Sequence, residues 1–140
     1  MFTVGGKYFF GEIKESLGVK DGSAILKNNK ENKFVALCVE RGFNFLEPNI
    51  MLVKNGSFIR KIGRDLSGAK YPIRFFLRDS GESKYIYLGD VTIEETKTAP
   101  GKVKSRLQAF PKINPKDISR LVYLNMPNKS MQPTADASAD

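Results

Sequence analysis

Residues 71–93 carry the pattern that most restricts what this chain can fold into. At its start, the apolar residues Ile73, Phe75 and Leu77 alternate with Arg74, Phe76 and Arg78. Such alternation is typical of a strand with one apolar and one basic face. The polar segment 79–83 contains a glycine and suits a hairpin loop, and 84–88 is rich in strand-forming residues. Gly89 and Asp90 mark a bend or bulge. The stretch therefore predicts an antiparallel meander with one face buried.

The composition fits a single soluble domain. With 140 residues, of which 41% are apolar and 27% charged, the chain is long enough to form a hydrophobic core without disulfides. No apolar run approaches the ~18 residues that a membrane-spanning helix requires. Residues 1–4 lack the basic start of a signal peptide. We therefore expect a cytoplasmic protein with no membrane partner.

The absence of histidine excludes many classes of enzyme. The chain has no His and a single Cys38, so it contains no Ser-His or Cys-His nucleophile pair, no HNH-type nuclease site and no zinc site built from His and Cys. Residues 5–7, Gly-Gly-Lys, lack the earlier glycine of a phosphate-binding loop. Cys38 lies in the apolar run 34–39 and is expected to be buried. No cofactor is predicted.

The positive charge is concentrated in two segments. The chain has 23 Lys and Arg against 15 Asp and Glu, a formal net charge of +8. Residues 51–78 contain seven basic residues and one acidic residue, and so do residues 97–120. Clustering of this kind favours a polyanionic partner, most simply nucleic acid. Of the two nucleic acids we expect DNA rather than RNA, although charge does not distinguish them. The alternative is a basic surface that is merely solvated.

The remaining patterns predict an α+β domain over residues 1–125, with a curved, mainly antiparallel sheet (a PUA-like open barrel) and two or three short helices. Apolar residues at helical spacing predict helices over 8–17 and 58–66. Ser57 is the expected N-cap of the second helix. Strands are expected at 24–26, 34–39 and 49–54.

Two further segments are expected to cover the core. In the loop 42–48, the side chains of Phe43, Phe45 and Leu46 are expected to pack inward. Asn114-Pro115 is a typical helix start, with a cap residue followed by proline at the first helical position. The apolar side of that helix would be formed by Ile118, Leu121, Val122 and Leu124.

The order of these elements resembles that of PUA-like or SRA-like domains, which occur before HNH nuclease domains and at the ends of some restriction-associated helicases. The resemblance covers about residues 6–96. It depends on an aromatic-led helix ending in Leu17-Gly18, on the Tyr-Pro-Ile-Arg-Phe strand at 71–75, and on the Tyr-Ile-Tyr-Leu-Gly strand at 85–89. Because readers of that superfamily bind nucleic acid, often at modified or flipped bases, the resemblance implies a nucleic-acid-binding module of this kind.

The basic segment 51–78 supplies the predicted contacts. Arginine and lysine side chains are expected to bind phosphates, and exposed aromatic rings to stack on bases. The predicted binding residues are Lys54, Arg60, Lys61, Arg64, Lys70, Arg74, Arg78, Phe76 and Tyr87.

Two alternatives to a reader stay open. Glu95-Thr96-Lys97 reproduces the Glu-x-Lys half of a metal-dependent nuclease site, with Asp90 or Asp79 as the second carboxylate. Catalysis by Asp90, Glu95 and Lys97 would require both acids to bind one Mg²⁺. The other alternative is a protein-interaction module of the antirestriction or antitoxin type. We expect a binding protein rather than an enzyme.

Residues 126–140 differ in composition from the rest of the chain. They are small, polar and proline-containing without periodicity, which indicates a tail. Residues 131–135, Met-Gln-Pro-Thr-Ala, resemble the ends of proteins encoded by bacterial integron gene cassettes. If the tail is ordered, we expect a contact with another subunit, as in a homodimer.

Overall fold

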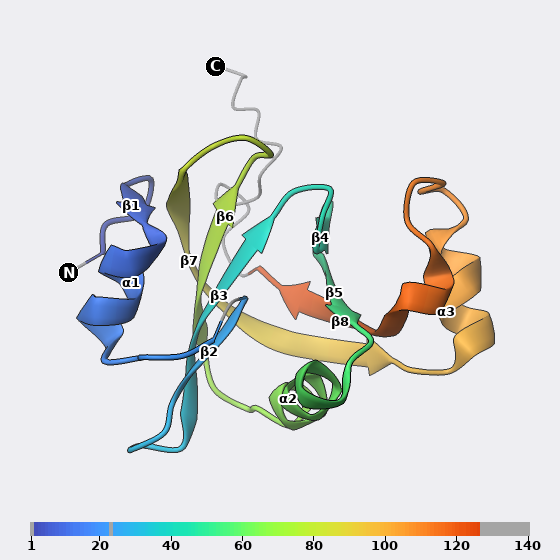
Figure 1. Ribbon diagram of the computed structural model, residues 1–140, viewed down its shortest axis with the longest axis horizontal. Coiled ribbons are helices and arrows are strands. Elements are labelled where there is room, and N and C mark those ends of the chain that lie inside the picture. The colour runs from blue at the N-terminus through green and yellow to red at the C-terminus, as the bar shows by residue number, and fades with distance from the viewer. Residues whose placement is uncertain (1, 23, 127–140) are drawn as a thin grey trace.

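The computed structural model describes residues 2–22 and 24–126 and consists of one curved sheet with three helices on its faces (Figure 1). The elements are β1 (Lys7–Phe9), α1 (Phe10–Leu17), β2 (Ile25–Asn28), β3 (Lys33–Glu40), β4 (Phe45–Leu46), β5 (Ile50–Lys54), α2 (Ser57–Ser67), β6 (Ile73–Arg78), β7 (Lys84–Lys97), α3 (Pro100–Leu107), the 3-10 helix η1 (Pro115–Asp117) and β8 (Ile118–Asn125). None of the helices in this part of the chain is long and apolar enough to cross a membrane.

The sheet is continuous and mostly antiparallel, in the order β2-β3-β6-β7-β8-β5-β4, with β1 paired to β7. Only β3 and β6, among the described strands, pair in parallel. The sheet does not close, because β2 and β4 stand at its two ends. The prediction of an α+β domain with a curved, mainly antiparallel sheet and up to three short helices is therefore confirmed.

The 14-residue strand β7 joins the two halves of the sheet. Its first part pairs with β1 and β6, and its second part pairs with β8. The register shifts at Leu88, where Phe75 faces Gly89 and Phe76 faces Tyr87. Gly89 has a φ of +103°, a conformation that side chains disfavour. The bulge expected at Gly89-Asp90 therefore lies one residue earlier, at Leu88, and a second shift follows at Glu94.

Local signals fix the ends of the first two helices. Helix α1 begins two residues after the predicted start, because residues 7–9 pair with β7 instead. The carboxylate of Glu12 accepts a hydrogen bond of 2.7 Å from the backbone N–H of Phe9, and Gly18 ends the helix with a φ of +69°. Helix α2 has Gly56 rather than Ser57 as its N-cap.

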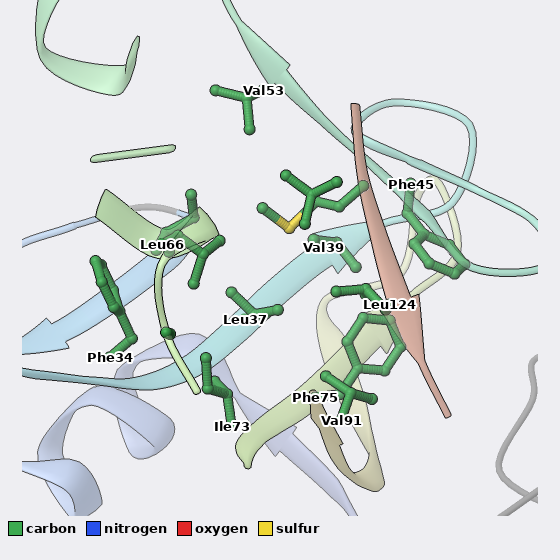
Figure 2. Packing of buried hydrophobic residues seen from close by; sticks show 14 of the residues in the cluster. Phe34, Leu37, Val39, Phe45, Val53, Leu66, Ile73, Phe75, Val91 and Leu124 are labelled. Atoms are coloured by element: carbon green, nitrogen blue, oxygen red, sulfur yellow. The ribbon is translucent and has the colours of Figure 1, made fainter. Parts of the chain in front are cut away.

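Three hydrophobic clusters hold the helices to the sheet. The central cluster takes residues from both halves of the sheet and from α2; Figure 2 labels Phe34, Leu37, Val39, Phe45, Val53, Leu66, Ile73, Phe75, Val91 and Leu124. The second cluster includes Ile13 of α1 with Cys38 and Phe76. The third joins Val103 and Leu107 of α3 to β5 and β8. The helices α1 and α3 lie toward opposite ends of the long axis, with α2 between them (Figure 1).

The predicted C-terminal helix is wrong. The side chain of Asn114 accepts a hydrogen bond from the N–H of Lys116, as an N-cap does, but only one 3-10 turn follows. Residues 118–125 instead form β8 between β7 and β5. The run Leu121-Val122-Tyr123-Leu124 contains β-branched and aromatic residues, and both faces of the strand are buried in different clusters.

Two phenylalanines of the predicted apolar patterns are exposed. Phe43 is 55% exposed and Phe58 is 72% exposed. Phe58 lies in the first turn of α2, whereas Ile62 and Leu66, further along the same helix, belong to the central cluster or pack against it. By contrast, Phe45 and Leu46 are buried as predicted.

The described chain ends at Met126, the first residue of the predicted tail. Met126 is 8% exposed and belongs to the central cluster, so the fold includes this side chain. The rest of the predicted tail, residues 127–140, lies outside the described residues. A tail-mediated contact between subunits therefore stays a prediction.

The close packing of α2 on β5 yields a stability prediction. A Cβ placed on Gly63 would lie 2.7 Å from Cγ1 of Val53, whereas one on Gly101 in α3 would meet nothing within 4 Å. We expect Gly63→Ala to destabilise the protein by about 1–2 kcal/mol, because overpacking outweighs the helix propensity of alanine. Gly101→Ala, the control, should stabilise it by up to about 1 kcal/mol. Urea unfolding measures both, and equal stability of the two variants would contradict the packing argument.

Candidate nucleic-acid interface

The predicted binding residues do not form one surface patch but lie in several separate parts of the fold. Arg60, Lys61 and Arg64 project from the exposed face of α2, as predicted. Lys70 is exposed in the connection from α2 to β6, and Arg74 is half-buried on β6 opposite Asp90. Arg78, at the end of β6, lines a cavity that sequence reasoning did not foresee.

This cavity has a volume of about 300 Å³ and lies at the carboxyl ends of the parallel strands β3 and β6. We call it the Tyr85 cavity. It is lined by Phe10, Ala24, Cys38, Glu40, Phe43, Asn44, Arg78 and Tyr85.

Aromatic rings form much of the wall of the Tyr85 cavity. The ring centroids of Phe10 and Tyr85 lie 6.0 Å apart with an interplanar angle of 45°. The guanidinium of Arg78 lies 4.7 Å from the centroid of Tyr85. Nζ of Lys54, another predicted residue, lies 4.2 Å from the centroid of Phe43, which places a cation beside the exposed part of the wall.

A carboxylate and an amide supply the polar groups of the cavity. Oε1 of Glu40 accepts from Nε of Arg78 at 3.2 Å and lies 3.1 Å from its Nη2, so the arginine is held by a two-atom contact. The backbone N–H of Glu40 donates to Oδ1 of Asn44 at 2.7 Å. Among the described residues no hydrogen bond is recorded to Oε2 of Glu40 or from Nδ2 of Asn44. These two atoms can therefore accept from and donate to a ligand.

The other titratable groups of the cavity are neutral. Burial raises the pKa of the Cys38 thiol far above its usual range, and the nearby Arg78 opposes this only in part. Burial also raises the pKa of Tyr85. Cys38 is thus an unreactive thiol and Tyr85 an intact phenol at neutral pH. The cavity offers a ligand its shape and the hydrogen-bonding groups of Glu40 and Asn44.

The expectation that Phe76 is an exposed stacking residue is wrong. Phe76 is fully buried, because α1 and the N-terminal segment cover the outer face of β6. Its ring contacts those of Phe2 and Tyr87 at centroid distances of 5.0 Å each. Tyr87 is half-buried in the same aromatic cluster, and its hydroxyl donates to Oδ1 of Asp90 at 2.7 Å.

The alternative nuclease site is not assembled. Asp90 and Glu95 lie five residues apart on the same strand, which at a rise of about 3.3 Å per residue separates them by about 16 Å, too far to bind one ion. Asp90 accepts from Tyr87, Glu95 lies 3.9 Å from Nζ of Lys97, and Asp79 pairs with Arg41. Within residues 2–22 and 24–126, no group of three or more acidic or Cys side chains could hold a metal ion.

Sequence reasoning missed several residues of the interface. Glu40 and Arg78 end the two strands of the parallel pair and are register partners. Predicting that pairing would have placed them together, because ligands commonly bind at the carboxyl ends of parallel strands. Arg120 was assigned to a helix, and its place beside α2 carries no local signal. Two other hollows, of about 530 and 620 Å³, include none of the predicted binding residues.

With this geometry in place, the fold can be compared with known proteins. No family model matches the chain. No curated protein matches it either. Two solved structures are similar: the SUVH5 SRA domain in complex with methylated CHH DNA (14% identity, TM-score 0.52) and the same domain with fully methylated CG DNA (18% identity, TM-score 0.54). Each alignment covers 94% of this chain and 92% of the SRA chain. The chain therefore has an SRA-like fold, as the sequence resemblance implied.

The phenol of Tyr87 yields a prediction of pH dependence. Burial, the hydrogen bond to Asp90 and the negative charge of Asp90 together raise its pKa to about 12, and the charge of Arg74 opposes them in part. The unfolded phenol loses its proton near pH 10, so the stability that the folded state derives from the protonated form is lost as pH rises from about 10 to 12. Tyr87→Phe, which keeps the ring, should show a smaller loss of unfolding free energy across this range in urea titrations. Equal losses in both proteins would contradict the assignment.

Proposed function

We propose that the protein is a DNA-binding module that accepts one flipped, modified base in the Tyr85 cavity. The observation that carries this proposal is the combination of aromatic walls with a carboxylate oxygen and an amide group free to hydrogen-bond, in a cavity of single-base size. Enzymes and readers that extrude a base hold it by stacking and by hydrogen bonds to its Watson–Crick edge.

The polar groups indicate which bases would fit. Oε2 of Glu40 can accept from the exocyclic amino group of cytosine or adenine, and Nδ2 of Asn44 can donate to a ring nitrogen or carbonyl. The Glu40–Arg78 contact neutralises the carboxylate without covering both of its oxygens. The cavity therefore favours an amino-bearing base over thymine or uracil.

The structural neighbours support DNA as the partner. The SUVH5 SRA domains were crystallised with methylated DNA, and their fold extends over nearly the whole of this chain. The separate basic face on α2 and the exposed Lys70 supply positive charge outside the cavity, where backbone phosphates would lie.

We propose in addition a cytoplasmic site of action, a homodimer with a tail-mediated contact, and an origin on a bacterial gene cassette, on the sequence evidence given above.

The test compares two exposed phenylalanines that differ in position. Phe43 lines the Tyr85 cavity and Phe58 does not, so Phe43→Ala and Phe58→Ala remove the same ring from different places. We expect Phe43→Ala to weaken binding by about 1–3 kcal/mol, the usual contribution of a base–aromatic stack, and Phe58→Ala to leave it unchanged.

The DNA probes for this test are three duplexes of one sequence, carrying 5-methylcytosine, cytosine or a mismatched cytosine at one position. Wild-type protein should bind the mismatched and methylated duplexes more tightly than the plain one, because an unpaired base costs less to extrude and a modified base fits the cavity. Glu40→Ala, which removes the acceptor, should reduce these differences, because it weakens only the complexes in which the base has entered the cavity. Equal binding of all three duplexes by the wild type would overturn base flipping, and no binding at low salt would overturn DNA as the partner.

A further inference from the structure

Helix α2 presents a row of cations on one face. Arg60, Lys61 and Arg64 follow Ser57 at intervals of three, four and seven residues, which places all four side chains on the same side of the helix. The opposite face, including Leu66, packs into the central cluster. The basic face therefore cannot turn inward.

A fourth cation, Arg120, reaches this face from β8. Arg120 pairs in register with Val53 of β5, the residue against which Gly63 of α2 packs. Its Nη1 donates to Oγ of Ser67 at 2.8 Å, and that hydroxyl donates to the carbonyl of Gly63 at 2.9 Å. The guanidinium of Arg120 is thereby held against the helix.

These side chains line one pocket of about 480 Å³, which we call the Arg120 pocket. Its lining consists of Ser57, Arg60, Lys61, Arg64, Thr98, Ser119 and Arg120. Ser119 donates to the carbonyls of Val53 and Lys54, whereas Ser57 and Thr98 supply hydroxyl groups with no recorded side-chain hydrogen bond among the described residues. All of the charged side chains in this lining are positive.

The charge of the pocket is only partly compensated. Lys61 lies 3.4 Å from Oδ2 of Asp65. Within the described part of the chain, no carboxylate is recorded within ion-pair distance of Arg60, Arg64 or Arg120. Nε of Arg120 is buried, with no hydrogen-bond partner among the residues that the structure describes. Burial lowers the pKa of Arg120, and the charges of Arg64 and Arg60 lower it further. An anion in the pocket would supply a hydrogen-bond acceptor for this buried arginine and would offset the repulsion between the positive charges.

We propose that Arg60, Arg64 and Arg120, with the hydroxyl groups of Ser57 and Thr98, bind one backbone phosphate of the DNA at a site separate from the Tyr85 cavity. Planar guanidinium groups match the oxygens of a phosphate in pairs, and hydroxyl groups add donors to the remaining oxygens. This assignment rests on the proposed function for its ligand, but the site itself follows from the charges and geometry of α2 and β8.

The first experiment uses inorganic phosphate as the probe. The melting temperature of the wild-type protein should rise with phosphate concentration at constant ionic strength, relative to chloride. Arg64→Ala and Arg120→Ala should lose this rise. Arg106→Ala removes the same charge from the exposed surface of α3, outside the pocket, and should keep it, which controls for net charge and for the general stabilising effect of phosphate. The side chain of Arg64 makes no hydrogen bond recorded within residues 2–22 and 24–126, so its variant remains informative if Arg120→Ala fails to fold.

The second experiment measures DNA affinity against salt concentration, with duplexes that lack terminal phosphates. Arg64→Ala and Arg120→Ala should each reduce the slope of log K against log salt by about one and weaken binding to methylated and plain duplexes by the same factor. Arg120→Lys, which keeps the charge, should keep the slope while binding more weakly than wild type. Arg106→Ala should match the wild type.

The outcomes separate this site from the proposed function. A melting temperature that responds equally to phosphate in wild type and Arg64→Ala would overturn the site. If phosphate stabilises the wild type but Arg64→Ala and Arg120→Ala keep the wild-type salt slope for DNA, the site does not bind the DNA backbone. A small phosphate ester would then be the indicated ligand. A phosphate response without any DNA binding would refute the proposed function while leaving an anion site in place. Loss of base preference in the two variants would contradict the separation from the Tyr85 cavity.

Discussion

The rest of the structure depends on the way in which β7 changes partners. A single strand of 14 residues pairs with β6 in its first part and with β8 in its second, and register shifts at Leu88 and Glu94 accommodate the change. Bulges of this kind increase twist and bend a strand. The bend lets residues from both halves of the sheet, such as Phe75 and Leu124, meet in one cluster (Figure 2). A straight β7 would leave the two halves in one flat sheet with no common core.

The two candidate sites lie on different halves of the sheet. The Tyr85 cavity uses the ends of β3 and β6, on the first half of the sheet, whereas the Arg120 pocket uses α2 and β8, on the second. Gly63 permits α2 to approach Val53 closely, and Val53 pairs with Arg120. The same contact therefore packs the core and sets the distance between the guanidinium groups of α2 and that of β8. A larger residue at position 63 would disturb the charged pocket as well as the core.

The strands that the sequence predicted well are those with unambiguous local patterns. The strand Ile73–Arg78 follows from alternation, and the bulge at Leu88 lies directly beside Gly89, the residue that indicated it. The sequence could not show that α1 covers the outer face of β6, and for that reason Phe76 was expected to be exposed. It also could not distinguish β8 from a helix, because Leu121, Val122 and Leu124 suit a helix face as well as a strand buried on both sides. The partners that decide these cases are distant in sequence.

Charge gives the two sites different physical roles. In the Tyr85 cavity the positive charge of Arg78 is balanced by Glu40, and both Cys38 and Tyr85 are neutral. Recognition there would depend on shape and on hydrogen bonds, which salt affects weakly. The guanidinium groups of the Arg120 pocket have no such balance, so binding there would release counterions and weaken as salt rises. Because base contacts specify and phosphate contacts position, a protein with this division can alter its base preference at Glu40 or Asn44 without changing its hold on the backbone.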